Sequence, residues 1–115
     1  MSTIIRDAEI VTASDVYRAD VRVEDERIAA IGEHLPAESG DEIVDGSDQL
    51  LIPGGIDPHV HMALPFMGTV SIDNFESGSI AAIMGGTTGM IDFVIPAKGE
   101  SLLATLETWH AKAEG

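Results

Sequence analysis

Cysteine is absent from the 115-residue chain, and this absence excludes several kinds of chemistry. Without thiols the chain can form no disulfide framework, no thiolate nucleophile and no zinc site with cysteine ligands. Hydrophobic residues make up 44% of the sequence and charged residues 23%, and there are 12 glycines. This is the composition of a small globular domain rather than of a disordered or fibrous chain.

Basic residues are scarce. Six lysines and arginines stand against 20 aspartates and glutamates, so the formal net charge is −14 at pH 7. A surface field of that sign repels phosphate backbones and anionic lipid headgroups. We therefore expect no nucleic-acid partner and no membrane partner.

Long hydrophobic runs are missing as well. The longest candidate for a membrane span, residues 80–95, is interrupted by Gly-Gly-Thr-Thr at residues 85–88 and by Asp92. A helix that crosses a bilayer needs about 20 apolar residues. The N-terminus also lacks the basic segment and long apolar run of a signal peptide. Together these absences predict a soluble, cytoplasmic protein.

Residues 1–52 have the alternating and β-branched patterns of short strands separated by turns. The expected strands cover residues 3–6, 9–12, 16–23 and 42–45. Glu24, Asp25 and Glu26 are expected at the tip of a hairpin, although the glycine that is usual at such a tip is absent. No stretch here is long enough for a helix, so this part is predicted to be a small β-sheet.

The pattern changes after Pro53. The expected elements are, in order, a strand over residues 56–62, a helix that begins after Asp73 and ends before Gly85, a strand over residues 90–95 and a helix that begins after Ser101. Asp73 and Glu76 have the spacing of a capping box, which predicts the start of the first helix. Gly85 and Gly86 predict its end. Near-continuous apolar strands that alternate with helices predict parallel pairing.

The chain is thus expected to have two parts, residues 1–52 and residues 53–115, and to belong to the α/β class. Two strand–helix units alone leave the edges of a parallel sheet unpaired. The sequence is therefore interpreted as the front part of a longer protein.

The sharpest motif is residues 55–61, Gly-Ile-Asp-Pro-His-Val-His. Alternate side chains of a strand point to the same face, so Asp57, His59 and His61 are expected to project together. Two imidazoles in such adjacent positions can meet on one zinc ion at about 2.0–2.1 Å from each nitrogen. The alternative is a pair of histidines that only form hydrogen bonds to the backbone or to solvent. The spacing of the histidines alone does not favour metal binding. The addition of Asp57 on the same face, of the glycine turn before the strand and of the strand–helix unit after it does.

Residues 55–61 resemble the first barrel strand of the amidohydrolase superfamily. Further segments resemble its dihydropyrimidinase and D-hydantoinase branch: residues 10–12, 19–21, 28–32, 65–69, 85–88 and 91–93. The resemblance extends over essentially the whole chain, and the motifs occur in family order. One departure is the hairpin tip, where Asp25-Glu26 stands in place of the usual Asp-Gly.

The resemblance implies N-terminal β-sandwich strands followed by the first two βα units of a (β/α)8 TIM-type barrel. It implies two Zn²⁺ ions bridged by a carboxylated lysine that lies outside this chain. His59 and His61 would hold the more buried ion, and Asp57 would support them without touching the metal. No catalytic residue would lie within the chain. The full-length protein would be a homotetramer that opens the cyclic amide bond of dihydropyrimidines or hydantoins.

The loop that follows the histidines, residues 62–71, is apolar. In hydantoinases this loop shapes the pocket for the substituent on the substrate ring, and the resemblance assigns that role to Leu64 and Phe66. Ordinary packing over the barrel mouth is the alternative for both residues. Asp92 is interpreted as a residue that supports the site or bonds to the backbone, and His34 and His110 as ordinary surface or packed histidines.

Three alternatives remain open at this stage. The chain could be an inactive truncated fragment, or part of a non-catalytic homologue similar to the collapsin-response mediators. The latter lack the metal-binding histidines, which are present here. Allantoinase and dihydroorotase share the His-x-His strand, but residues 65–69 favour dihydropyrimidinase. In every case the 115-residue chain alone is expected to be inactive, since two histidines are fewer than the three protein ligands of a catalytic zinc ion.

Overall fold

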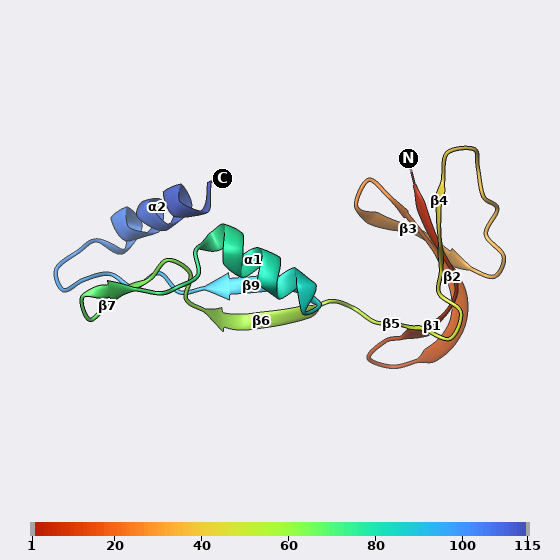
Figure 1. Ribbon diagram of the computed structural model, residues 1–115, viewed down its shortest axis with the longest axis horizontal. Helices are drawn as coiled ribbons and strands as arrows, with labels where there is room; N and C mark the ends of the chain where they lie inside the picture. The colour runs from red at the N-terminus through yellow and green to blue at the C-terminus, as the bar shows by residue number, and fades with distance from the viewer. Residues whose placement is uncertain (1, 115) are drawn as a thin grey trace. The chain divides into compact units, whose positions relative to one another are not determined.

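The computed structural model describes residues 2–114, and the chain divides between Pro53 and Gly54 into two units. Among the described residues, the first unit has strands and no helix, and the second combines strands with two helices (Figure 1). The change from strands alone to strands and helices therefore falls at the Pro-Gly-Gly segment. Assignment of the two units to a β-sandwich and to a barrel stays a prediction.

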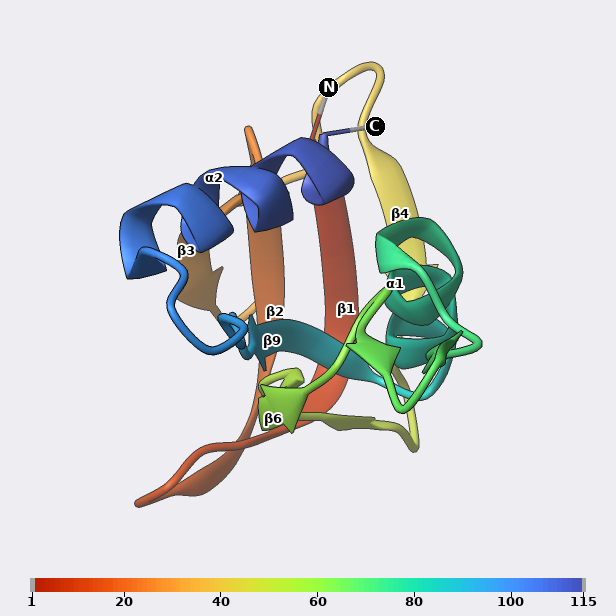
Figure 2. The same ribbon diagram turned by 90° about the vertical axis from the view of Figure 1, so that its left-hand side faces the viewer.

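The first unit is a five-stranded mixed sheet. Its strands are β1 (Thr3–Val11), β2 (Val16–Glu24), β3 (Arg27–Gly32), β4 (Glu42–Asp45) and β5 (Leu50–Leu51). The order is β3-β2-β1-β4, with β5 also paired to β1, so that β1 lies between β2 and β4 (Figure 2). The β1–β2 and β2–β3 pairs are antiparallel, whereas β4 and β5 run parallel to β1. The prediction of a small sheet is confirmed.

One detail of that prediction is wrong. Residues 3–6 and 9–12 were expected to be two strands, but they belong to the single strand β1. A bulge shifts the register between Ile5 and Ala8, and Asp7 takes a φ of 54° within it. The backbone N–H of Asp7 donates to Asp20 Oδ1 at 2.9 Å. An extra residue in one strand bends it without ending it, so Asp7 is a kink and not a break.

The second unit is built around a parallel pair of strands. Strand β6 (Gly55–Val60) pairs with β9 (Thr87–Asp92), and helix α1 (Phe75–Met84) lies between them in the sequence. Helix α2 (Leu102–Ala113) follows β9. Figures 1 and 2 both show β6 and β9 side by side. The predicted strand–helix–strand–helix order and the parallel pairing are confirmed.

Several boundaries in this unit differ from the prediction. Strand β6 ends at Val60 and does not reach residue 62, and strand β9 covers Thr87–Asp92 rather than residues 90–95. Helix α1 is capped by Asn74 rather than by Asp73: Asn74 Oδ1 accepts from the N–H of Ser77 at 2.8 Å, and the Ser77 hydroxyl accepts from the N–H of Asn74. Asp73 instead accepts a hydrogen bond from the Ser77 hydroxyl. Two adjacent residues that are both good caps made the sequence ambiguous by one position.

A short hairpin lies in the loop between β6 and α1 and was not expected from the sequence. Strands β7 (Pro65–Phe66) and β8 (Thr69–Val70) are antiparallel. Met67 and Gly68 form the turn, with φ angles of 49° and 81°. Positive φ at both central residues is typical of tight hairpin turns. Methionine in the first of these positions hid the turn in the sequence.

No helix within residues 2–114 is long and apolar enough to span a bilayer.

The tip of the β2–β3 hairpin offers a test of strain. Asp25 and Glu26 have φ angles of 46° and 62°, a region that costs an L-residue roughly 1–2 kcal/mol but is open to glycine. We expect Glu26→Gly to raise the free energy of unfolding by about 0.5–1 kcal/mol in denaturant titrations. Glu33→Gly, outside the left-handed region, is the matched control and should bring no gain. Equal gains in both variants would contradict this account.

A second test concerns Asp41, which is held against the edge of the sheet. Its carboxylate accepts from the Ser2 hydroxyl at 2.5 Å and from the N–H of Glu38 at 2.8 Å, and Arg22 lies 3.3 Å away. The Ser2 hydrogen bond is the largest of the influences that lower the pKa of Asp41 below its ordinary 3.8. The ionised Asp41 carboxylate therefore stabilises the folded chain fully above pH 3.8. This contribution is lost as the pH falls through the lowered pKa.

We expect Ser2→Ala to raise the pKa of Asp41 toward 3.8, as measured by NMR titration of the carboxyl carbon. Ser47→Ala is the matched control. The Ser47 hydroxyl and N–H lower the pKa of Asp45, so this variant should move the Asp45 titration and leave Asp41 in place. A Ser2→Ala variant with an unchanged Asp41 titration would refute the assignment.

Candidate metal centre

Two histidines meet at the carboxyl end of β6. His59 lies in the strand and His61 follows directly after it, so their side chains share one face. The two Nε2 atoms are 3.2 Å apart. The ring centroids are 5.0 Å apart and the ring planes are 78° from parallel. Both residues are exposed, so the face that they share is open.

The separation of the two nitrogens can be compared with the geometry of a zinc ion. Two ligands of a tetrahedral zinc, each at 2.0–2.1 Å, are about 3.3–3.4 Å apart. The observed 3.2 Å is close to that span. In the absence of a metal, the same distance suits a hydrogen bond from one ring to the other. The donor set and its spacing therefore fit a divalent ion such as zinc.

Phe93 packs against the pair from the neighbouring strand end. Its ring stacks on His59, with centroids 4.1 Å apart and planes 27° from parallel, and it lies 5.8 Å from His61. The parallel pairing of Val60 with Asp92 places Phe93 there. Sequence reasoning did not identify Phe93 as a site residue. A signal was present, since Phe93 follows directly after the second parallel strand, at the edge where the histidines were expected.

Asp57 supports His59 through the backbone. Its Oδ1 accepts a hydrogen bond from the His59 N–H at 3.1 Å. Pro58, between them, has no N–H to donate. The carboxylate therefore fixes the chain just before the first imidazole. This contact is compatible with the supporting role predicted for Asp57, which stays a prediction.

Asp92 holds the two strand ends together. Its Oδ1 accepts from the N–H of Met62 at 3.3 Å and from the N–H of Phe93 at 2.8 Å, and its Oδ2 accepts from the indole N–H of Trp109 at 3.1 Å. Its partners thus include two backbone N–H groups and one side chain from α2. The sequence left open whether Asp92 supports the site or bonds to the backbone, and the structure shows backbone bonds beside the histidines.

Helix α1 fixes the residue that follows His61. The Met62 side chain is buried, with 8% of its surface exposed, and it lies against Gly78. A Cβ added at Gly78 would come within 2.3 Å of the Met62 sulfur. Only a glycine at this position lets the helix approach so closely.

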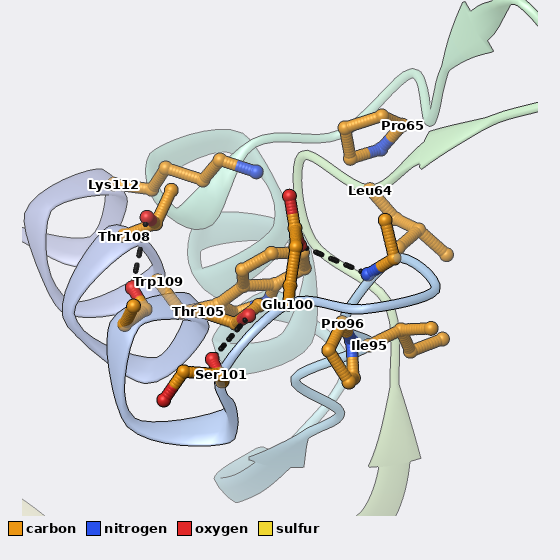
Figure 3. A pocket seen from close by; sticks show the side chains of 12 residues that line it. Leu64, Pro65, Ile95, Pro96, Glu100, Ser101, Thr105, Thr108, Trp109 and Lys112 are labelled. Carbon is orange, nitrogen blue, oxygen red and sulfur yellow. Dashed lines mark hydrogen bonds between the residues drawn. The ribbon is translucent and has the colours of Figure 1, made fainter.

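Leu64 and Phe66 lie in different surroundings. Leu64 lines an open cavity of about 660 Å³ together with residues 95–97 and the first three turns of α2 (Figure 3). The backbone N–H of Leu64 donates to the Ser71 hydroxyl at 2.9 Å. Phe66 lies on the β7–β8 hairpin with 61% of its surface exposed and is not part of the cavity lining. The structure therefore does not bring the two side chains into one pocket.

The remaining histidines lie elsewhere. His34 is exposed in a turn of the first unit, and His110 is exposed on α2. Within the part of the chain that the structure describes, no three His, Asp or Glu side chains come together as a metal-binding cluster. His59 and His61 thus offer two imidazole nitrogens at one place.

Known proteins resemble this chain in both sequence and fold, although no family model matches it. It is 52% identical to the D-hydantoinase of Geobacillus stearothermophilus, over 100% of this chain and 24% of that protein. It is 49% identical to dihydropyrimidinase 2 of Caenorhabditis elegans, over 99% of this chain and 22% of that protein.

Solved structures give the same result. A crystal structure of a D-hydantoinase superposes with a TM-score of 0.93 at 50% identity, and covers 98% of this chain and 24% of its own. A D-hydantoinase (dihydropyrimidinase) from Thermus sp. also has a TM-score of 0.93, at 44% identity, over 97% of this chain and 24% of its own. The chain therefore spans about a quarter of the length of these relatives. It belongs to the D-hydantoinase and dihydropyrimidinase family and corresponds to an N-terminal portion of its members.

Proposed function

We propose that the protein carrying this chain hydrolyses the cyclic amide bond of dihydropyrimidines or hydantoins, and that His59 and His61 hold a metal ion at its active site. The observation that carries the proposal is the 3.2 Å separation of the two Nε2 atoms at the carboxyl end of a parallel strand. Active sites of (β/α)8 barrels lie at that end of their strands. The names of the relatives support the substrate class.

The family resemblance implies two Zn²⁺ ions and a carboxylated lysine that lies outside this chain, and His59 and His61 would hold one of the ions. When bound, such ions lower the pKa of a bound water and polarise the ring carbonyl. The residues of this chain would bind the metal ion and orient the two imidazoles. His59 and His61 present their ring nitrogens, Phe93 stacks on one ring, and Asp57 fixes the backbone that carries it.

The wider setting is part of the same proposal. Residues 53–115 would begin the barrel, residues 1–52 would contribute to a β-sandwich, and the whole enzyme would be a cytoplasmic homotetramer. The net charge of −14 supports a small-molecule substrate over nucleic acid or a membrane. Two imidazoles are fewer than the three protein ligands of a catalytic zinc ion, so catalysis would require groups beyond this chain.

The metal assignment is tested by His59→Ala and His61→Ala in the protein translated from the complete reading frame. Each variant removes one of few ligands, so we expect it to lose at least one metal ion per subunit and most of its turnover of dihydrouracil and hydantoin. Metal content is measured by mass spectrometry of the purified protein and turnover by ring opening. His34→Ala and His110→Ala are matched controls, expected to keep both properties.

Two results would contradict the proposal. Full metal content with near-normal turnover in both site variants would show that His59 and His61 are not metal ligands. Absence of turnover in the unsubstituted, metal-loaded protein would favour the non-catalytic homologue instead.

Substrate recognition by the loop after β6 is a separate prediction. If Leu64 and Phe66 contact the ring substituent, Leu64→Ala and Phe66→Ala should lower kcat/KM about tenfold for hydantoins with a large apolar substituent. Unsubstituted hydantoin should be affected much less. Met67→Ala is the control, since Met67 lies at the hairpin tip with 89% of its surface exposed. Equal losses for both substrates, with a lower melting temperature, would indicate packing alone.

A further inference from the structure

The carboxylate of Asp92 accepts hydrogen bonds from the backbone just after both strands of the parallel pair. Its Oδ1 accepts from the N–H of Met62, the residue after His61. The same oxygen accepts from the N–H of Phe93, whose ring stacks on His59. Oδ1 of Asp92 thus holds the backbone next to His61 and also the backbone of Phe93, whose ring supports His59.

The other oxygen of Asp92 is held by helix α2. The indole N–H of Trp109 donates to Oδ2 at 3.1 Å, and the indole is buried, with 7% of Trp109 exposed. Lys112, one turn further along α2, lies 3.9 Å from the centre of the indole ring and donates to the carbonyl of Ala63 at 3.0 Å. Helix α2 therefore contacts Asp92 at the end of β9 through Trp109 and the segment after His61 through Lys112, and Figure 3 shows Trp109 and Lys112 on the same helix.

We propose that Asp92 and Trp109 are positioning residues for the histidine pair, and that their hydrogen bond sets the separation of the two imidazoles and so the affinity for metal. The inference rests on the proposed metal-binding role of His59 and His61. It names a cause for the separation of the two imidazoles: the indole N–H selects one orientation of the Asp92 carboxylate. That orientation aims Oδ1 at the two backbone N–H groups. Outer groups of this kind change metal affinity although they do not touch the metal.

Trp109→Phe tests the inference because phenylalanine keeps an aromatic ring beneath Lys112 and removes the N–H. The metal-free protein from the complete reading frame is titrated with Co²⁺, and the dissociation constant and the visible absorption of the bound ion are recorded. We expect the dissociation constant to rise about tenfold and the absorption spectrum to change. Thr108→Val is the matched control, since it removes a hydroxyl that bonds only to Ala104 within the same helix.

Asp92→Asn provides a second variant if Trp109→Phe folds poorly. The asparagine oxygen can still accept from the two backbone N–H groups, but the amide nitrogen then faces the indole N–H, and two donors cannot pair. We expect the same weakening of Co²⁺ binding. The double variant should bind no more weakly than either single one, because both changes remove one hydrogen bond.

The outcomes separate the two proposals. If His61→Ala leaves Co²⁺ binding unchanged, the proposed metal site fails. If His61→Ala abolishes binding while Trp109→Phe and Asp92→Asn leave the dissociation constant and spectrum unchanged, only the positioning role fails. A lower melting temperature with unaltered Co²⁺ binding also overturns it, because the hydrogen bond would then serve stability alone.

Discussion

The parallel pairing of β6 with β9 is the constraint on which the candidate site depends. Val60 lies opposite Asp92, and the N–H of Phe93 donates to the Val60 carbonyl at 3.3 Å. This register brings two segments about thirty residues apart to the same edge, with the histidines on one and Asp92-Phe93 on the other. A shift by one residue would turn alternate side chains to the opposite face. The stacking on His59 would then be lost.

The sequence allowed much of this arrangement to be predicted, since the signals were local. Period-two spacing placed His59 and His61 on one face, and glycines and caps marked the helix that separates the strands. Apolar strands alternating with helices indicated parallel pairing, and the pairing is observed. Patterns over a few residues carry such information because backbone periodicity and capping are short-range effects.

The contacts that organise the pair were not predictable in the same way. The stacking of Phe93 on His59 depends on strand register, which a single short apolar strand does not define. Even the start of the strand was missed, since the expected strand over residues 90–95 begins three residues after the observed one. The bond from Trp109 to Asp92 depends on the packing of a helix that begins ten residues later. A stripe of apolar residues predicts a buried helix face, but it does not say which atom the indole N–H will meet.

These contacts lead to a physical account of what the chain contributes to metal binding. Two imidazoles do not complete a zinc site, yet their spacing is already near that of two ligands on one ion. The groups that surround the pair — Asp57, Asp92, Phe93 and Trp109 — all belong to the second unit. Side chains that are ordered before binding lose less conformational entropy when the ligand arrives. A further ligand from elsewhere in the protein would therefore join a pair already spaced for the metal. The affinity that this ligand adds would not be reduced by an entropy cost of ordering the two imidazole rings.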